Sequence, residues 1–148
     1  MTFHDLPENW SDLPLDTPGL AADVADLVVG DQDRLAGCIG LVLVQPDLTM
    51  GQPYVISDVD VRAGSPEELR PFLDELCGML AETERALLFV RGRDGSVLVT
   101  DSDRCWHQVA IDSCRRAGVR LVGAFLATPA AVRSFPAPFD VAVDDLVS

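Results

Sequence analysis

The stretch from residue 85 to residue 128 constrains the fold of this chain most, because two short apolar runs flank a well-delimited amphipathic helix. Residues 86–90 and 119–126 have the length and composition of strands that are covered on both faces. Between them, Thr100 can cap the start of a helix, and Gly118 sits where a left-handed residue commonly ends one. A strand, a helix and a strand in this order predict the centre of an α/β fold.

The segment between the first apolar run and the helix predicts a tight turn. Asp94-Gly95 is a strong turn signal, and residues 97–99 are expected to return as a short antiparallel strand. The helix is then expected over residues 101–117. Asp101 and Asp103 fall in its first turn, where a carboxylate interacts favourably with the positive end of the helix dipole.

Four further elements are predicted upstream of this stretch. They are a helix over 18–29, a strand over 36–45, a strand over 54–61 and a helix over 66–84. Thr17 with Pro18 marks the first helix start, and Ser65 with Glu68 forms the S-x-x-E pattern of a capping box at the second. Residues 31–34 read as a polar connector, and the two strands are expected to form a hairpin.

The predicted order of elements is α-β-β-α-β-(β)-α-β, which indicates an α/β fold with a small mixed β-sheet and a parallel centre. We expect one domain over residues 18–148, preceded by an extended acidic arm over residues 1–17. After residue 128 the prolines favour only a short turn at 130–133, while residues 141–147 form either an edge strand or a tail.

The charge of the chain is concentrated at its ends. The net charge is −13, and residues 1–33 hold eight acidic side chains and neither Arg nor Lys. All eleven basic residues of the chain are Arg. A chain without a basic surface is a poor nucleic-acid binder, and the lack of Lys excludes the lysine of a phosphate-binding loop and a Schiff base.

Several other classes of chemistry lack their sequence signature. The four cysteines form no C-x-x-C pair, and we expect them to be reduced and mostly buried. With only two histidines, a histidine-rich metal site is excluded, so we expect no metal and no cofactor. The chain shows neither a secretory signal nor an apolar run long enough to span a bilayer, and we expect a cytoplasmic protein with no membrane partner.

Polar residues at the predicted strand ends are the candidate ligand-binding set, because ligands of open α/β sheets bind beyond the carboxyl ends of the strands. The set comprises Asp58, Asp60, Arg91, Arg93, Asp101, Trp106 and Thr128. Asp103 and His107 lie four residues apart on one helix face, so the carboxylate can orient the imidazole as a general base or as a metal ligand. A solvated or capping interaction is the competing interpretation of that pair.

Residues 60–128 carry a resemblance to known proteins. Its motifs are the helix beginning at Ser65, the run ALLFVRG, the run DSDRCWH and the run AGVRLVGA. In these motifs the chain resembles small actinobacterial proteins known only as domains of unknown function. The motifs consist mostly of packing and capping residues, and the resemblance implies no activity.

These observations favour a non-enzymatic module that binds a partner protein or associates with itself. Its candidate contact residues are the apolar side chains of the arm, Phe3, Trp10, Leu13 and Leu15. The arm can dock either on its own domain or on a second subunit. The alternative is a small-ligand-binding protein or hydrolase that uses a strand-end crevice formed by Asp60, Arg91, Asp101, Asp103 and His107. A third interpretation is an acidic decoy for a basic partner.

Overall fold

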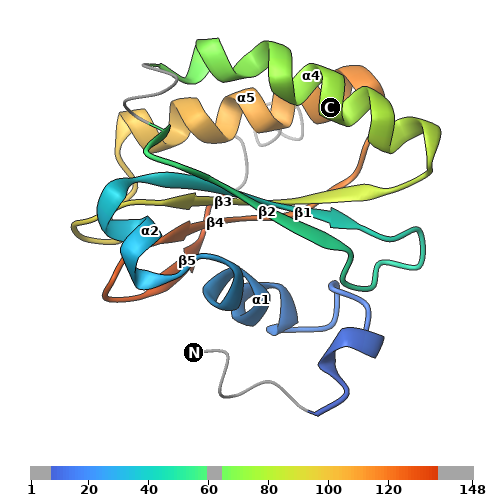
Figure 1. The fold of residues 1–148 in the computed structure, drawn as a ribbon, viewed down its shortest axis with the longest axis horizontal. Coiled ribbons are helices and arrows are strands. Elements are labelled where there is room, and N and C mark those ends of the chain that lie inside the picture. Colours follow the sequence, from blue (N-terminus) through green and yellow to red (C-terminus); the bar gives the residue numbers. More distant parts are fainter. Residues whose placement is uncertain (1–7, 60–64, 137–148) are drawn as a thin grey trace, which may run out of the picture.

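The chain folds around one twisted sheet that carries helices on both faces (Figure 1). The structure is a computed structural model, and it describes residues 8–59 and 65–136. The helices are η2 (Trp10–Asp12, a 3₁₀ turn), α1 (Leu20–Val28), α2 (Asp31–Ala36), α4 (Pro66–Glu82) and α5 (Asp101–Ala117). The strands are β1 (Cys38–Val44), β2 (Gln52–Ser57), β3 (Ala86–Gly92), β4 (Leu121–Ala127) and β5 (Val132–Ser134).

The five described strands lie in the order β2-β1-β3-β4-β5. The β3–β4 pair is parallel, and the other three pairs are antiparallel. This arrangement confirms the mixed α/β sheet with a parallel centre and the hairpin formed by β1 and β2. Because β2 pairs only with β1, it forms one edge of the sheet, in agreement with its partly polar sequence.

The sheet is buried on both faces because successive residues of its central strands face opposite layers. In β1, Ile39 and Leu41 pack toward α4 and α5, whereas Val42 and Val44 pack toward α1. Gly40 lies against α1 so closely that an added Cβ would come within 2.8 Å of Val29 Cγ2. The glycine therefore allows close packing of β1 against this helix. In Figure 1, α4 and α5 cover one face of the sheet, and α1 covers the other.

The start of α1 differs from the prediction. The helix begins at Leu20 after Gly19, whose φ is 80°, and the Leu20 N–H donates to the carbonyl of Thr17 over 3.0 Å. Pro followed by a left-handed Gly is the preferred centre of a type II turn, so Pro18-Gly19 forms a turn rather than a first helical turn. Residues 31–36, expected to be a connector, form the short helix α2.

The predicted return strand over residues 97–99 is wrong. Residues 93–100 contain no strand, because β3 already pairs with β1 along one edge and with β4 along the other. A strand has two hydrogen-bonding edges only, so a local turn signal cannot add a third neighbour.

The two long helices begin in different ways. At α5, Thr100 Oγ1 accepts from the Asp103 N–H over 3.1 Å, and Asp103 Oδ2 accepts from the Thr100 N–H over 2.9 Å. These two reciprocal bonds form a capping box. The sequence predicted a capping box at Ser65, and at α5 only a cap by Thr100. Ser65 makes no side-chain capping bond at α4, so that prediction is wrong, although the helix begins at Pro66 as expected.

Smaller differences concern strand bounds. β2 begins at Gln52, so Pro53 lies inside an edge strand, where a missing N–H is tolerated. The turn expected at residues 130–133 gives way to β5, which pairs antiparallel with β4. Residues 141–147 lie outside the described part of the chain. Among the described residues, no helix has both the length and the apolar composition to cross a membrane.

Candidate functional site

The carboxyl end of β3 and the first turns of α5 bring together several of the residues that the sequence singled out. Asp103 is completely buried and binds Arg93 through three hydrogen bonds, from Nε to Oδ1 over 2.8 Å and to Oδ2 over 3.1 Å, and from Nη2 to Oδ2 over 2.7 Å. Burial acts to raise the pKa of Asp103, but the hydrogen bonds from Arg93 and Thr100 outweigh it and hold that pKa below its ordinary value. Asp103 is therefore ionised and fully engaged in closing the start of α5.

Arg91 completes the charged part of this cluster. Its side chain is buried, its Nε lies 4.0 Å from Asp103 Oδ1, and its guanidinium carbon lies 5.2 Å from the centre of the Trp106 ring. A guanidinium over an indole face at this distance is a favourable cation–π contact. We call Arg91, Arg93, Asp103 and Trp106 the strand-end cluster.

His107 lies beside the strand-end cluster in an aromatic environment. Its ring stacks on Phe135 with centroids 4.5 Å apart, and the ring of Phe89 lies 6.4 Å away. Burial lowers the pKa of His107 to about 4, so the imidazole is neutral at neutral pH. The carboxylate that was predicted to orient it, that of Asp103, accepts hydrogen bonds from Arg93 and from the Thr100 N–H in the capping box.

Of the remaining predicted ligand-binding residues, Asp101 and Asp58 lie apart from the cluster where the structure describes them. The side chain of Asp101 is fully exposed and pairs with Arg104 over 3.1 Å. Asp58 is exposed, with a left-handed φ of 54°, and it follows β2, which is separated from β3 by β1. Asp60 lies outside the described residues, so its place in a crevice stays a prediction.

Thr128 is held from the opposite face of the sheet by a residue that sequence reasoning missed. Arg34 in α2 is buried and donates from Nη1 to the Thr128 carbonyl over 2.9 Å. It also donates from Nε to the Val29 carbonyl over 2.9 Å and from Nη2 to Asp26 Oδ1 over 2.6 Å. Arg34 thereby ties the end of β4 to α1, and no local pattern in the sequence marks it for this role.

Within the described cluster, the Asp103 carboxylate pairs with Arg93 and lies near Arg91. Among the described residues, no group of three or more His, Cys, Asp or Glu side chains is placed to hold a metal ion. The contacts of the strand-end cluster cap the start of α5 and attach this helix to β3.

The predicted contact residues of the N-terminal arm lie on the domain itself where they are described. Leu15 is buried against α1, and its N–H donates to the Leu48 carbonyl over 2.7 Å. Trp10 and Leu13 are partly buried against the same core. Phe3 lies outside the described residues. The side chains of Trp10, Leu13 and Leu15 are thus used to cover the α1 face.

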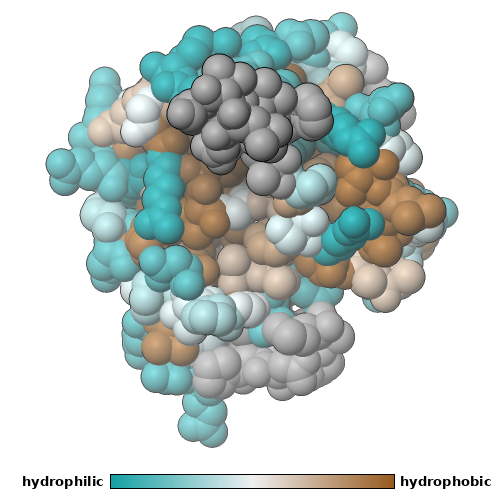
Figure 2. Space-filling model, turned by 180° about the vertical axis from the view of Figure 1, so that it is seen from behind, coloured by the Kyte–Doolittle hydropathy of each residue, from teal (hydrophilic) through white to brown (hydrophobic). Residues whose placement is uncertain are grey.

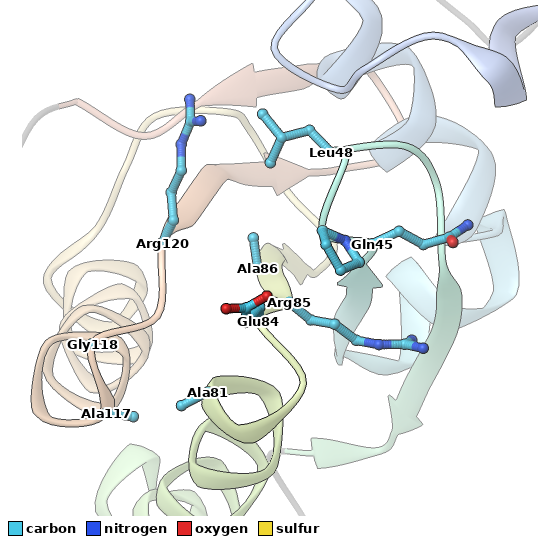
Figure 3. A pocket seen from close by; sticks show the side chains of 10 residues that line it. Gln45, Leu48, Ala81, Glu84, Arg85, Ala86, Ala117, Gly118 and Arg120 are labelled. Carbon is cyan, nitrogen blue, oxygen red and sulfur yellow. The ribbon is translucent and has the colours of Figure 1, made fainter.

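A pocket of about 460 Å³ opens at the other end of the sheet, between the last turns of α4 and α5 (Figure 3). Its lining includes Glu84, Arg85 and Arg120 over a floor of small side chains. The Arg85 and Arg120 side chains extend in different directions, away from each other and from the Glu84 carboxylate (Figure 3). Charges that diverge in this way do not form a common anion site.

A second opening lies between α4 and the edge strand β2 and is almost entirely apolar. We call it the α4–β2 groove and define it by Tyr54, Ile56, Phe72, Leu76 and Met79. It encloses about 310 Å³ and adjoins a hollow of about 490 Å³ that shares Phe72, Leu76 and Met79. Unlike the strand-end cluster, this surface is open.

The groove gathers large apolar side chains that the fold leaves uncovered. Tyr54, Phe72 and Met79 are 51%, 48% and 51% exposed, and they are three of the six large apolar side chains exposed among the described residues. On the opposite side of the molecule from Figure 1, hydrophobic residues form separate areas with hydrophilic and intermediate residues between them (Figure 2). Single exposed apolar side chains are common on protein surfaces. A contiguous group of them, in contrast, marks a binding surface.

A row of carboxylates runs along the same side of α4. Glu68, Glu75 and Glu82 are all exposed, and they alternate with Phe72 and Met79 at spacings of four and three residues. Residues at these spacings share one helix face. The groove therefore combines apolar side chains with negative charge along about 14 residues of helix, or roughly 20 Å.

Comparison with protein-family models and with curated proteins found no match to this chain. The resemblance that the sequence suggested thus stays an expectation. The candidate site rests on geometry, and that geometry favours the α4–β2 groove.

Proposed function

We propose that this chain is a non-enzymatic, cytoplasmic protein-binding module whose α4–β2 groove receives an amphipathic, basic segment of a partner protein. The observation that carries the proposal is the pairing of half-exposed Phe72 and Met79 with Glu68, Glu75 and Glu82 on one face of α4. Apolar side chains of a partner would fill the groove, while its Lys or Arg side chains would face the carboxylates.

The apolar part of the groove supplies the affinity. Tyr54, Phe72 and Met79 each keep about half of their surface in contact with water. Burying the remainder of each contributes roughly 1 kcal/mol. Phe72 and Met79 are seven residues apart on α4, about 10 Å along the helix axis, so they match apolar side chains at positions i, i+3 or i+4, and i+7 of a helical segment.

The charge around the groove selects the partner. A second copy of this chain would bring another net charge of −13, and the acidic ends of the chain carry the same sign as the groove. A basic segment is attracted instead, and such complementarity accelerates association and discriminates between partners. Pro53 supplies no N–H at the edge of β2, which weakens binding by strand addition and leaves side-chain docking as the favoured mode.

A synthetic peptide tests the proposal with the full-length chain. The probe is a 15-residue helical peptide with Leu at positions i, i+4 and i+7 and Lys or Arg beside them. Its control carries Glu at the basic positions. We expect the basic peptide to bind in the micromolar range, to shift the amide resonances of α4 and β2, and to weaken as salt rises.

Protein variants localise the binding. Changing Phe72→Ser and Met79→Ser together should weaken binding of the basic peptide at least tenfold. Leu98→Ser, at a side chain that is 70% exposed and not part of the groove, should leave it unchanged. Equal binding of both peptides, or resonance shifts away from α4 and β2, would refute the proposal. If sedimentation shows that the natural chain is a dimer and the double variant is a monomer, the occupant of the groove is a second copy of this chain rather than a basic partner.

A further inference from the structure

Two cysteines from different helices meet in the core between α4 and α5. Cys77 and Cys114 are 0% and 2% exposed, and their sulfur atoms lie 3.9 Å apart. Both are free thiols. This separation is a van der Waals and weak hydrogen-bonding contact, whereas a disulfide requires about 2.05 Å, so the two sulfur atoms must approach each other further before a bond forms.

Polar contacts hold the two helices together beside this pair. Ser113 Oγ donates to Asp74 Oδ1 over 2.7 Å, and Arg70 Nη1 donates to Asp112 Oδ2 over 3.0 Å. Each of these contacts joins α4 to α5. The sulfur atoms are thus held face to face by bonds within a few residues of them.

We propose that Cys77 and Cys114 form a redox-sensitive site that hydrogen peroxide converts to an intramolecular disulfide linking α4 to α5. The two remaining cysteines are placed differently. Cys38 is buried on the α1 face of the sheet, and Cys105 is exposed on α5. Neither shares this contact.

The reaction balances with peroxide as the only oxidant. The Cys77 sulfur, as thiolate, attacks one peroxide oxygen, the O–O bond breaks, and the leaving hydroxide takes up a proton to give water. The Cys114 thiol then attacks the sulfenic sulfur of Cys77, losing its proton and displacing a second water. Two thiols and one H₂O₂ become one disulfide and two waters.

The order of the two cysteines follows from their contact. The contact with Cys114 lowers the pKa of Cys77, while the same contact, followed by burial, raises the pKa of Cys114. The thiolate is the reactive form, so Cys77 attacks first and Cys114 resolves. Because both sulfurs are buried, access requires local opening, and we expect oxidation over minutes to hours.

The test uses the full-length chain with Cys38→Ala and Cys105→Ala, which leaves only the proposed pair. After treatment with hydrogen peroxide under native conditions, we expect loss of both free thiols and a peptide that joins Cys77 to Cys114 in non-reducing digests. The closed loop spans 37 residues, so the midpoint of thermal unfolding should rise by roughly 5–10 °C and return after dithiothreitol.

The control adds Cys77→Ala to the same background and should show neither the cross-linked peptide nor the rise. The cross-link is mapped on the unsubstituted pair, so a control variant that folds poorly does not obscure the result. Thiols that stay reduced, sulfinic acid without a cross-link, or a link that forms only in denaturant would each show that the pair merely fills the core. None of these outcomes bears on peptide binding at the groove.

Discussion

The strand-end cluster and the α4–β2 groove differ in how far their side chains are paired and exposed to water. In the cluster, Arg93 and Asp103 satisfy each other within hydrogen-bonding distance and are largely withdrawn from water. In the groove, Phe72 and Met79 have no such cover and stay about half exposed. Charged residues thus pair with one another at one end of the molecule, whereas exposed apolar residues form the surface at which we propose that a partner docks.

The largest effect expected from this comparison is the loss of Asp103. Asp103→Ala removes the capping box of α5 and the buried carboxylate that pairs with the half-buried Arg93 and lies near the buried Arg91, so the free energy of unfolding should fall by about 3–5 kcal/mol. Urea denaturation measures this change. Asp101→Ala lies in the same first turn but is fully exposed, and it should leave the denaturation midpoint nearly unchanged. If the free energy of unfolding falls by a similar amount in both variants, Asp103 stabilises the fold only through the interaction of its charge with the dipole of α5.

The pH dependence of stability tests the burial of His107 next. The pKa of His107 is about 4 in the folded chain, against 6.5 for an unperturbed histidine. Between these values the unfolded chain binds a proton that the folded chain does not. Stability is therefore complete above pH 6.5 and falls by roughly 3 kcal/mol as the pH drops toward 4.

Denaturation at a series of pH values should show this slope in the natural chain and lose it in His107→Gln. His4→Gln, which removes the other histidine, should retain it. The contribution of Asp103, whose folded pKa is depressed, is lost only at lower pH, as that carboxylate becomes protonated. A slope that survives His107→Gln would assign the acid sensitivity to another group.

The smallest effect is expected in the groove. Phe72→Ser and Met79→Ser each remove a side chain that is about half exposed, so the free energy of unfolding should change by less than about 1 kcal/mol. Leu73→Ala on the same helix removes a fully buried side chain and should cost about 3 kcal/mol. Loss of stability in all three variants to a similar extent would mean that the groove residues belong to the core.

Much of the fold could be predicted because its signals are local. The apolar runs of β3 and β4 and the capped stripe of α5 lie within one stretch, where spacing alone indicates which residues are buried. Predictions failed where a distant partner decided the outcome. Residues 97–99 have the composition of a strand, but β1 and β4 already occupy both edges of β3.

The groove escaped prediction for a related reason. Phe72 falls on the apolar stripe of its helix together with Leu69 and Leu73, so its spacing indicates a core position. Leu69 and Leu73 are buried under α5 and the sheet, while Phe72 lies beside the edge strand, where the layer ends. The sequence did contain one sign of the groove, because the apolar stripe of α4 is wider than a single contact with the sheet and α5 requires.

The spacing of apolar residues and the capping signals, both properties of short segments, determined that this chain forms an α/β sheet flanked by helices. Only the tertiary structure decided which charged side chains are paired and which apolar side chains stay exposed. Arg93 meets Asp103 and Arg34 meets Thr128 because elements far apart in the chain pack side by side, whereas Tyr54 on the edge strand stays about half exposed.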